Sequence, residues 1–388
     1  MVSFEFATAG RILFGPGRIA DVPAQVAALG VTRVLLVTGT SPARAAPLRT
    51  ALVERGIAVI PFAVHGEPTL DTARQGVARA FTDGCDGVVA MGGGSPLDAG
   101  KAIAALLANG GDPLDYIEVI GRGRPIQRPS VPMIAVPTTA GTGSEVTRNA
   151  VLTSPEEQVK ASLRSPHMLP SLAVVDPDLL SSAPRDVLAA GGLDALSQLI
   201  EPYLSARANP FTDALASQGI ALSARSLRRA CLEGADRNAC IDLALASVLG
   251  GLCLANAGLG AVHGFAAPAG GMIGAPHGAV CAALLAASLE VNLRALRERR
   301  PDSASLARMS DVAVWLCGSE EPEAAIDWVR ALCDDLGVPG LAAWGMQRAD
   351  LPQLVARAKT ASSMRGNPIA LTDDELFEIA ERSLGAAP

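Results

Sequence analysis

Basic residues are neither numerous nor clustered in this chain of 388 residues, which carries 32 Lys and Arg against 39 Asp and Glu. The formal net charge is −7, and the chain has no cationic stripe of the kind that neutralises a phosphate backbone. We therefore exclude nucleic acid as a partner.

Repeats, low-complexity tracts and long charged tails are also missing. Because the length exceeds what one hydrophobic core usually supports, we expect two domains with a catalytic cleft.

The signals of disulfide formation and of export are absent. The seven cysteines are odd in number, never spaced Cys-x-x-Cys, and mostly embedded in Ala- and Leu-rich segments. This pattern excludes a disulfide framework and predicts buried free thiols in a reducing compartment. The N-terminal stretch lacks the basic start, long apolar core and cleavage site of an export signal. We expect a cytoplasmic protein.

Charged residues are absent from 243–289, and a hydropathy window there could suggest a membrane span. The same stretch contains Asn256, His263, His277, two prolines and many glycines. We interpret it as the buried middle of a helical domain that carries a few functional polar groups, and we expect no membrane partner.

The first half of the chain alternates short β-branched apolar runs with amphipathic stretches. This alternation is typical of βαβ units, which form a parallel sheet covered by helices. After the loop "SSAPR" at 181–185, long Ala- and Leu-rich helical patterns replace it. The sequence predicts an α/β domain over 1–183 and an all-helical domain over 184–388. We expect strands at 33–39, 57–62, 87–94, 133–139 and 172–177, and helices at 41–56, 71–84, 186–205, 211–230, 237–258 and 278–299.

Two glycine-rich loops follow predicted strands. In "AMGGGSPLDAGK" (90–101) the glycines let the backbone approach a ligand, and the following helix offers free N–H groups to a phosphate. "VPTTAGTGSEVT" (136–147) adds hydroxyl groups beside further glycines. Loops at the carboxyl ends of parallel strands favour a dinucleotide-binding crevice. The alternative is a pair of ordinary turns, because neither loop has the GxGxxG fingerprint.

Seven motifs resemble the iron-containing (group III) alcohol dehydrogenase family, which includes maleylacetate reductases, over almost the whole chain. The resemblance implies a Rossmann-like nucleotide-binding domain, an all-α C-terminal domain, an active site between them, NAD or NADP, a divalent metal ion and a homodimer. The motifs are "FGPG", "GGGSPLDAGK", "PTTAGTGSEVT", "VDPDLL", "GGLDALSQLIEPY", "HGFAAPAGGMIGAPHG" and "GNPIALT".

The resemblance also assigns cofactor contacts residue by residue. It places the pyrophosphate on the first loop, the body of the cofactor along the second, and the nicotinamide ribose near a following segment. For Lys160, also a candidate catalytic residue, the alternative is a solvated surface charge. The implied contacts are Gly93, Gly94 and Ser95 with Asp98 supporting the loop, then Thr138, Thr139 and Thr142, then Asn149 and Lys160.

The end of the first strand bears on the choice between NAD and NADP. NAD-preferring members of the family tend to have an acidic residue at the position of Gly39, where it binds the ribose 2′-hydroxyl and repels a 2′-phosphate. Its absence favours NADP slightly. Ser41 and Arg44 are candidate phosphate partners, although Arg44 could equally be an exposed helix residue.

The implied metal site departs from the family pattern. Asp194, His263 and His277 match three of the four ligand positions, but Gln198 replaces a His. A Gln oxygen is a weaker and harder donor than imidazole, so the Fe²⁺ or Zn²⁺ of the family should bind less tightly, and Mn²⁺ or Mg²⁺ are alternatives. A metal-free site would leave His263 and His277 as proton donors. Ala267 stands where many members have a further His.

The implied reaction is hydride transfer between nicotinamide and a small alcohol, aldehyde or ketone, assisted by the metal ion. The apolar, Ala-rich sequence with few aromatics suits an uncharged substrate. One alternative is a maleylacetate-reductase-like enzyme, whose carboxylated substrate would need Arg148, Lys160 or Arg365. A dehydroquinate-synthase-like lyase and a non-catalytic nucleotide-binding protein are further alternatives.

Overall fold

A computed structural model describes residues 3–157, 159–181, 183–232 and 236–385. Two compact units divide at 183/184, and residue 182 of the expected boundary loop lies outside the described part. The expected α/β range began at residue 1, but residues 3–6 cluster with the helical unit. The rings of Phe4 and Phe6 lie 5.0 and 5.8 Å from that of Phe211, so aromatic packing holds this segment to the helices.

The α/β unit is built on a six-stranded parallel sheet with the order β1-β8-β5-β4-β2-β3. The carboxyl ends of β2, β4 and β5 are neighbours at one edge of this sheet, which is where the two glycine-rich loops begin. The expected fold class is confirmed. The strands are β1 (Ile12–Phe14), β2 (Arg33–Thr38), β3 (Ala58–Ala63), β4 (Gly87–Gly92), β5 (Met133–Pro137) and β8 (Leu172–Val175).

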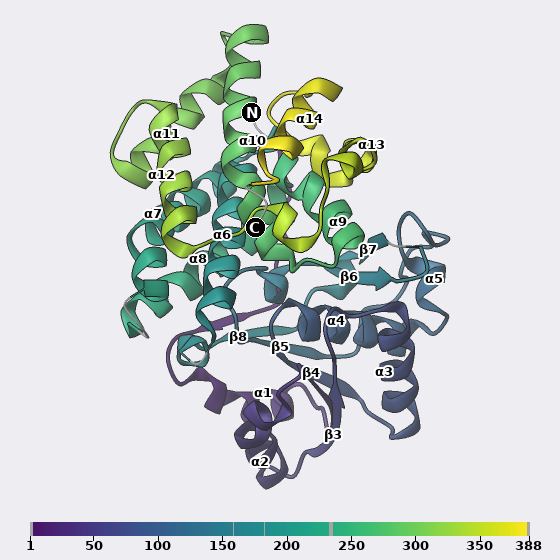
Figure 1. Ribbon diagram of the computed structural model, residues 1–388. Helices are drawn as coiled ribbons and strands as arrows, with labels where there is room; N and C mark the ends of the chain where they lie inside the picture. Colours follow the sequence, from purple (N-terminus) through teal and green to yellow (C-terminus); the bar gives the residue numbers. More distant parts are fainter. Residues whose placement is uncertain (1–2, 158, 182, 233–235, 386–388) are drawn as a thin grey trace. The chain divides into compact units, whose positions relative to one another are not determined.

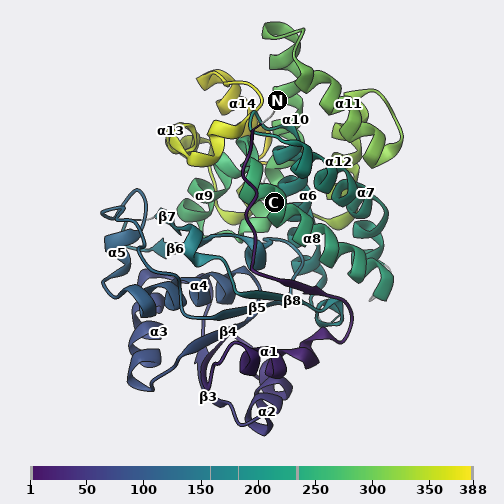
Figure 2. The same cartoon turned by 180° about the vertical axis from the view of Figure 1, so that it is seen from behind.

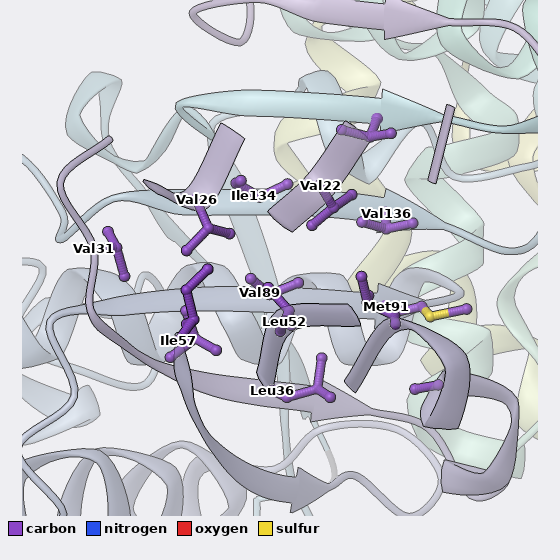
Figure 3. Packing of buried hydrophobic residues seen from close by; sticks show 14 of the residues in the cluster. Val22, Val26, Val31, Leu36, Leu52, Ile57, Val89, Met91, Ile134 and Val136 are labelled. Atoms are coloured by element: carbon purple, nitrogen blue, oxygen red, sulfur yellow. The ribbon is translucent and has the colours of Figure 1, made fainter. Parts of the chain in front are cut away.

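Helices cover both faces of the sheet. Alternate residues of each strand point to opposite faces, so each strand contributes side chains to both layers of packing. Leu36 joins a cluster with Val26 and Leu52 from α1 and α2 (Figure 3), whereas Leu35 faces α3 and α4 with Ile103. The two helix layers lie on opposite sides of the sheet in Figure 1. The helices are α1 (Val22–Ala28), α2 (Ala46–Glu54), α3 (Leu70–Thr82), α4 (Gly94–Asn109) and α5 (Pro113–Tyr116).

Sequence reasoning missed three strands of the α/β unit. β1 has only three residues and lies at the sheet edge, too short for a periodic pattern. β6 (Asn149–Ser154) and β7 (Val159–Arg164) form a separate antiparallel hairpin. Ala150 and Leu152 alternate with less buried neighbours in β6, which is the period-two signal that could have found it.

The helical unit is organised around α6, which packs against α7, α8 and α10. Figure 2 shows these helices from behind. No described residue after Ala183 lies in a strand, as expected. The helices are α6 (Arg185–Leu204), α7 (Pro210–Leu232), α8 (Arg237–Ala257), α9 (Ala261–Ile273), α10 (His277–Arg299), α11 (Ala304–Cys317), α12 (Pro322–Leu336), α13 (Leu351–Thr360) and α14 (Asp373–Arg382).

Two described helices, α8 and α10, are long and apolar enough to cross a membrane by length and composition. Within their most apolar windows, 67% and 78% of the residues are buried inside the structure. Burial of this extent is typical of the core helices of a globular domain, which are apolar because they contact other helices on several sides.

Candidate active site

The first glycine-rich loop brings the backbone of β4 directly into α4. Gly93 is the N-cap of α4 and provides no side-chain cap, so the N–H groups of the first helical turn, which includes Ser95, remain available to an anion. A Cβ on Gly93 would lie 3.2 Å from Thr139 Oγ1, and one on Gly94 would lie 2.9 Å from Thr142 Cγ2. The first loop has no side chains at Gly93 and Gly94. The two loops therefore lie in contact at these positions.

The second loop is anchored to α4 by a buried polar network. The Asp98 carboxylate accepts hydrogen bonds from the Ser144 hydroxyl (2.5 Å) and the Val151 N–H (2.9 Å). Lys101 Nζ lies 3.0 Å from Asp98 and donates to the Ser144 carbonyl (2.9 Å) and to Thr147 Oγ1 (3.0 Å). Burial lowers the pKa of Lys101, although Asp98 opposes this effect. Sequence reasoning identified Asp98 but missed Lys101, one helical turn later in the same motif.

The strand ends also connect the loops, since the Thr138 N–H donates to the Gly92 carbonyl at 2.9 Å. Gly39 follows β2 at the same edge, and a Cβ there would lie 3.6 Å from Pro96 Cγ, an ordinary contact. A larger side chain would thus fit at Gly39. Exposed Arg44 donates to the Leu179 carbonyl at 2.9 Å, and Ser41 is exposed beside it.

The hairpin separates the two residues expected near the nicotinamide ribose. Asn149 pairs with Arg164 and Lys160 pairs with Thr153, so they lie roughly 14 Å apart along the strands. Lys160 is not a solvated charge. Its side chain is 6% exposed, and its Nζ lies 2.6 Å from Glu67 Oε2.

A cluster of metal-ligating side chains lies within the helical unit. Asp194 comes from α6, His263 from α9, and His277 and Cys281 from the first turns of α10. One ligand atom from each lies within 4.8 Å of all the others. His263 Nε2 and His277 Nε2 lie 3.3 and 3.8 Å from Asp194 Oδ1, so the structure brings three of the four predicted ligands together.

Glu201 orients one of these ligands. It lies seven residues after Asp194 on the same face of α6. Its Oε2 lies 2.7 Å from His263 Nδ1, and its Oε1 accepts the Val262 N–H at 2.6 Å. A carboxylate that accepts the Nδ1 proton leaves the Nε2 lone pair facing the cluster, which is the usual arrangement behind a metal-bound His.

The cluster needs a positive charge at its centre. Asp194 is 1% exposed and its Oδ1 accepts no hydrogen bond from the described residues. Burial would raise the pKa of Asp194, yet His277, His263 and a hydrogen bond from Gln198 lower it. Burial would lower the pKa of each imidazole, but the Cys281 sulfur and Asp194 raise that of His277 to about 9 and that of His263 well above its usual value. The donors thus fit a divalent cation.

Small residues let the helices approach closely enough to form this cluster. A Cβ on Gly278 would lie 2.5 Å from the carbonyl oxygen of Ala190, so only glycine lets the start of α10 contact α6. In α8, a Cβ on Gly250 would lie 3.3 Å from Gln198 Cβ. Helix α8 therefore packs directly behind Gln198.

Sequence reasoning missed Glu201 and Cys281. Both carried a signal, because Glu201 lies at helical spacing from Asp194 and Cys281 follows His277 by four residues. Cys281 is buried and free, as predicted for the cysteines, but its Sγ faces the two imidazoles.

The protein combines two glycine-rich loops suited to phosphate with a buried cluster of side chains suited to a cation. This combination is a feature of metal-dependent oxidoreductases that use a dinucleotide cofactor. Residues 9–177 match the family described as "Iron-containing alcohol dehydrogenase", and residues 188–384 match "Fe-containing alcohol dehydrogenase family, C-terminal". The 1,3-propanediol dehydrogenase of Citrobacter freundii is 36% identical over 383 residues, which are 97% of this chain and 97% of that protein.

Solved structures agree with the sequence matches. A crystal structure of 1,3-propanediol oxidoreductase has a TM-score of 0.91 and 34% identity, and covers 98% of this chain and 100% of that chain. A sulfoacetaldehyde reductase from Bifidobacterium kashiwanohense, solved in complex with NAD⁺, has a TM-score of 0.87 and 28% identity, with 99% of each chain covered. The chain belongs to the iron-containing alcohol dehydrogenase family.

The family assignment defines the class of reaction. The protein is an oxidoreductase that transfers a hydride between a nicotinamide cofactor and an alcohol or carbonyl carbon. Members of the family use NAD(H) and a divalent metal, and this chain retains a cluster suited to the metal. The resemblance inferred from the motifs is confirmed.

Proposed function

We propose that this enzyme is a metal-dependent reductase of small, uncharged aldehydes or ketones that prefers NADPH. The observation that supports metal dependence is the buried Asp194 oxygen, which lacks a hydrogen-bond donor among the described residues and faces two imidazoles. A bound divalent ion would act as a Lewis acid on the substrate oxygen, and the nicotinamide would supply the hydride.

The residues of this chain have distinct roles in the proposal. Asp194, His263 and His277 hold the ion, and Glu201 fixes the ring of His263. Gly93, Gly94 and the first turn of α4 bind the pyrophosphate, and the Asp98 network keeps the second loop against them. Thr138, Thr139 and Thr142 line the cofactor.

The choice of an uncharged substrate rests on the cations available to a carboxylate. Lys160, one of the three candidate partners of a dicarboxylate, is already paired with Glu67 and nearly buried. A cation that is neutralised within the protein attracts a substrate carboxylate only weakly. This pairing removes one of the three candidate cations of the maleylacetate-reductase-like alternative. A homodimer and a cytoplasmic location stay predictions from the sequence.

The metal is tested by elemental analysis of protein purified without chelator, paired with NADPH and NADH oxidation on a panel of small aldehydes before and after EDTA. We expect about one divalent ion per chain and loss of turnover on chelation, with recovery on adding metal back. Undiminished turnover by metal-free protein would contradict the Lewis-acid function and leave the imidazoles as proton donors.

The preference for NADPH is tested with Gly39→Asp. The added Cβ meets only an ordinary contact with Pro96, so the fold should tolerate the change. A carboxylate there repels the 2′-phosphate, and we expect kcat/KM for NADPH to fall by about tenfold or more, a change of at least about 1.4 kcal/mol, relative to NADH. Gly39→Asn is the matched uncharged control. An unchanged ratio of the two cofactors would show that Gly39 does not face the 2′ position.

A further inference from the structure

We propose that the Cys281 thiolate is the fourth metal ligand of this enzyme, replacing the imidazole that Gln198 cannot provide. The inference rests on the proposed metal-dependent function and changes the ligand set from Asp, Gln and two His to Asp, two His and Cys. It also identifies the class of metal that the site selects.

Cys281 is placed for this role by α10. His277 is the first residue of that helix and Cys281 follows one turn later, so both side chains lie on the same helix face. Cys281 Sγ lies 3.6 Å from His277 Nε2 and 3.8 Å from His263 Nε2. The Cys281 side chain is fully buried, and its sulfur faces two nitrogen donors in place of an apolar neighbour.

The spacing of the four donors is that of a tetrahedral site. Bond lengths of about 2.3 Å to sulfur and about 2.0–2.1 Å to nitrogen and oxygen, at tetrahedral angles, give N···S separations of about 3.6 Å and N···O separations of about 3.3 Å. The N···S distances here are 3.6 and 3.8 Å, and the N···O distances are 3.3 and 3.8 Å. Four of the six donor pairs therefore lie within about half an ångström of tetrahedral separations, and all four donor atoms lie within 4.8 Å of one another.

Gln198 contacts both Asp194 and helix α8. It donates a hydrogen bond to Asp194, and its Oε1 accepts none from the described residues. That oxygen lies 3.7 Å from the position of a Cβ on Gly250, so it is beside α8. We infer that Gln198 is a positioning residue for Asp194, which would otherwise lose a hydrogen-bond partner in a buried site.

A thiolate changes which ions bind. Sulfur favours Zn²⁺, Co²⁺ and Fe²⁺ over Mg²⁺ and Mn²⁺, which prefer oxygen. The proposal therefore favours the Zn²⁺ or Fe²⁺ implied by the family over the alternatives Mn²⁺ and Mg²⁺. As the ion binds, a sulfur–metal bond replaces the S–H bond and nitrogen–metal bonds replace any proton held at Nε2 of the two imidazoles. These protons leave to solvent, so no oxidant or reductant is needed.

Cobalt(II) provides a test that does not depend on activity. Full-length protein is stripped of metal with a chelator and titrated with Co²⁺ under argon, while absorption is recorded. A thiolate ligand gives a sulfur-to-cobalt charge-transfer band in the near ultraviolet, and a four-coordinate ion gives intense visible bands. We expect both in the unmodified protein at one equivalent of Co²⁺.

Four variants assign the band. Cys281→Ser should lose the near-ultraviolet band and bind Co²⁺ more than about 100-fold more weakly, because loss of a ligand should exceed the 10- to 100-fold typical of an outer-shell partner. Gln198→Ala and the exposed-thiol control Cys317→Ser should keep the band. Circular dichroism checks that Cys281→Ser is folded, and the double variant with Gln198→His should regain affinity without the band.

The outcomes separate this inference from the proposed function. Loss of the band in Cys281→Ser alone supports the thiolate ligand. Stoichiometric Co²⁺ binding without the band, or a band that persists in Cys281→Ser, would overturn the inference and leave the metal-dependent function standing. Failure of the unmodified protein to bind Co²⁺ or Zn²⁺ would overturn both.

Discussion

Glu145 offers a pH-dependent test of the network below the second glycine-rich loop. It lies in the short 3-10 helix Ser144–Val146 and is 2% exposed. Burial raises the pKa of Glu145 from 4.5 to about 7, and the charge of Lys101 only partly offsets this. The rise from 4.5 to about 7 corresponds to about 3 kcal/mol at 1.36 kcal/mol per pH unit.

The direction of the effect follows from proton linkage. The folded state binds the Glu145 proton more tightly than the unfolded state, so this contribution to stability is fully present below pH 4.5 and is lost as the pH rises through about 7. Glu145→Gln removes the titration and keeps the size of the side chain. We therefore expect the stability of the variant relative to the unmodified protein to increase by about 3 kcal/mol between pH 4.5 and pH 8.

Urea unfolding followed by far-ultraviolet circular dichroism at several pH values measures this difference. With a slope near 2 kcal/mol per molar urea, about 3 kcal/mol shifts the midpoint by about 1.5 M. Glu157→Gln, on an exposed turn, removes the same charge from a solvated position as a control. Tryptophan fluorescence reports the helical unit separately, since Trp315, Trp328 and Trp344 all lie there. A midpoint difference for Glu145→Gln that is the same at every pH would refute the reasoning.

Two further predictions concern the metal cluster. Glu201→Gln should weaken metal binding about 10- to 100-fold, because an amide accepts the His263 proton less strongly than a carboxylate, and competition with a chromophoric chelator measures the change. An unchanged dissociation constant would show that Glu201 does not orient the ring. Gly278→Ala should cost about 1–3 kcal/mol in urea unfolding and reduce metal content, because its Cβ would lie 2.5 Å from the Ala190 carbonyl oxygen. Normal stability with full metal content would show that α6 and α10 adjust freely.

The expectation of a Mg²⁺- or Mn²⁺-tolerant site arose from considering ligand positions one at a time. Gln198 stands at a position that the family fills with His, so a weaker, harder site was the natural inference from that position. The sulfur that we propose as a ligand lies on another helix, 83 positions later in the chain. Its distance from His277 follows from helical spacing within α10, whereas its distance from His263 depends on how α9 and α10 pack.

The sequence by itself determined the parallel sheet, the helical second unit and the family. Hydrophobic periodicity specifies local structure, and glycines such as Gly93 and Gly94 mark places where the backbone must pass closely. The hairpin β6–β7 was missed, because its short strands are half polar and gain stability from tertiary contacts through residues such as Leu152.

Only the tertiary structure decided the partners of the polar groups. The pairing of Lys160 with Glu67 and the support of His263 by Glu201 join segments distant in the chain, and the approach of Cys281 to His263 joins two different helices. Such contacts form because buried charges and donors must find partners once the apolar faces have packed, and the packing selects which partners lie within reach.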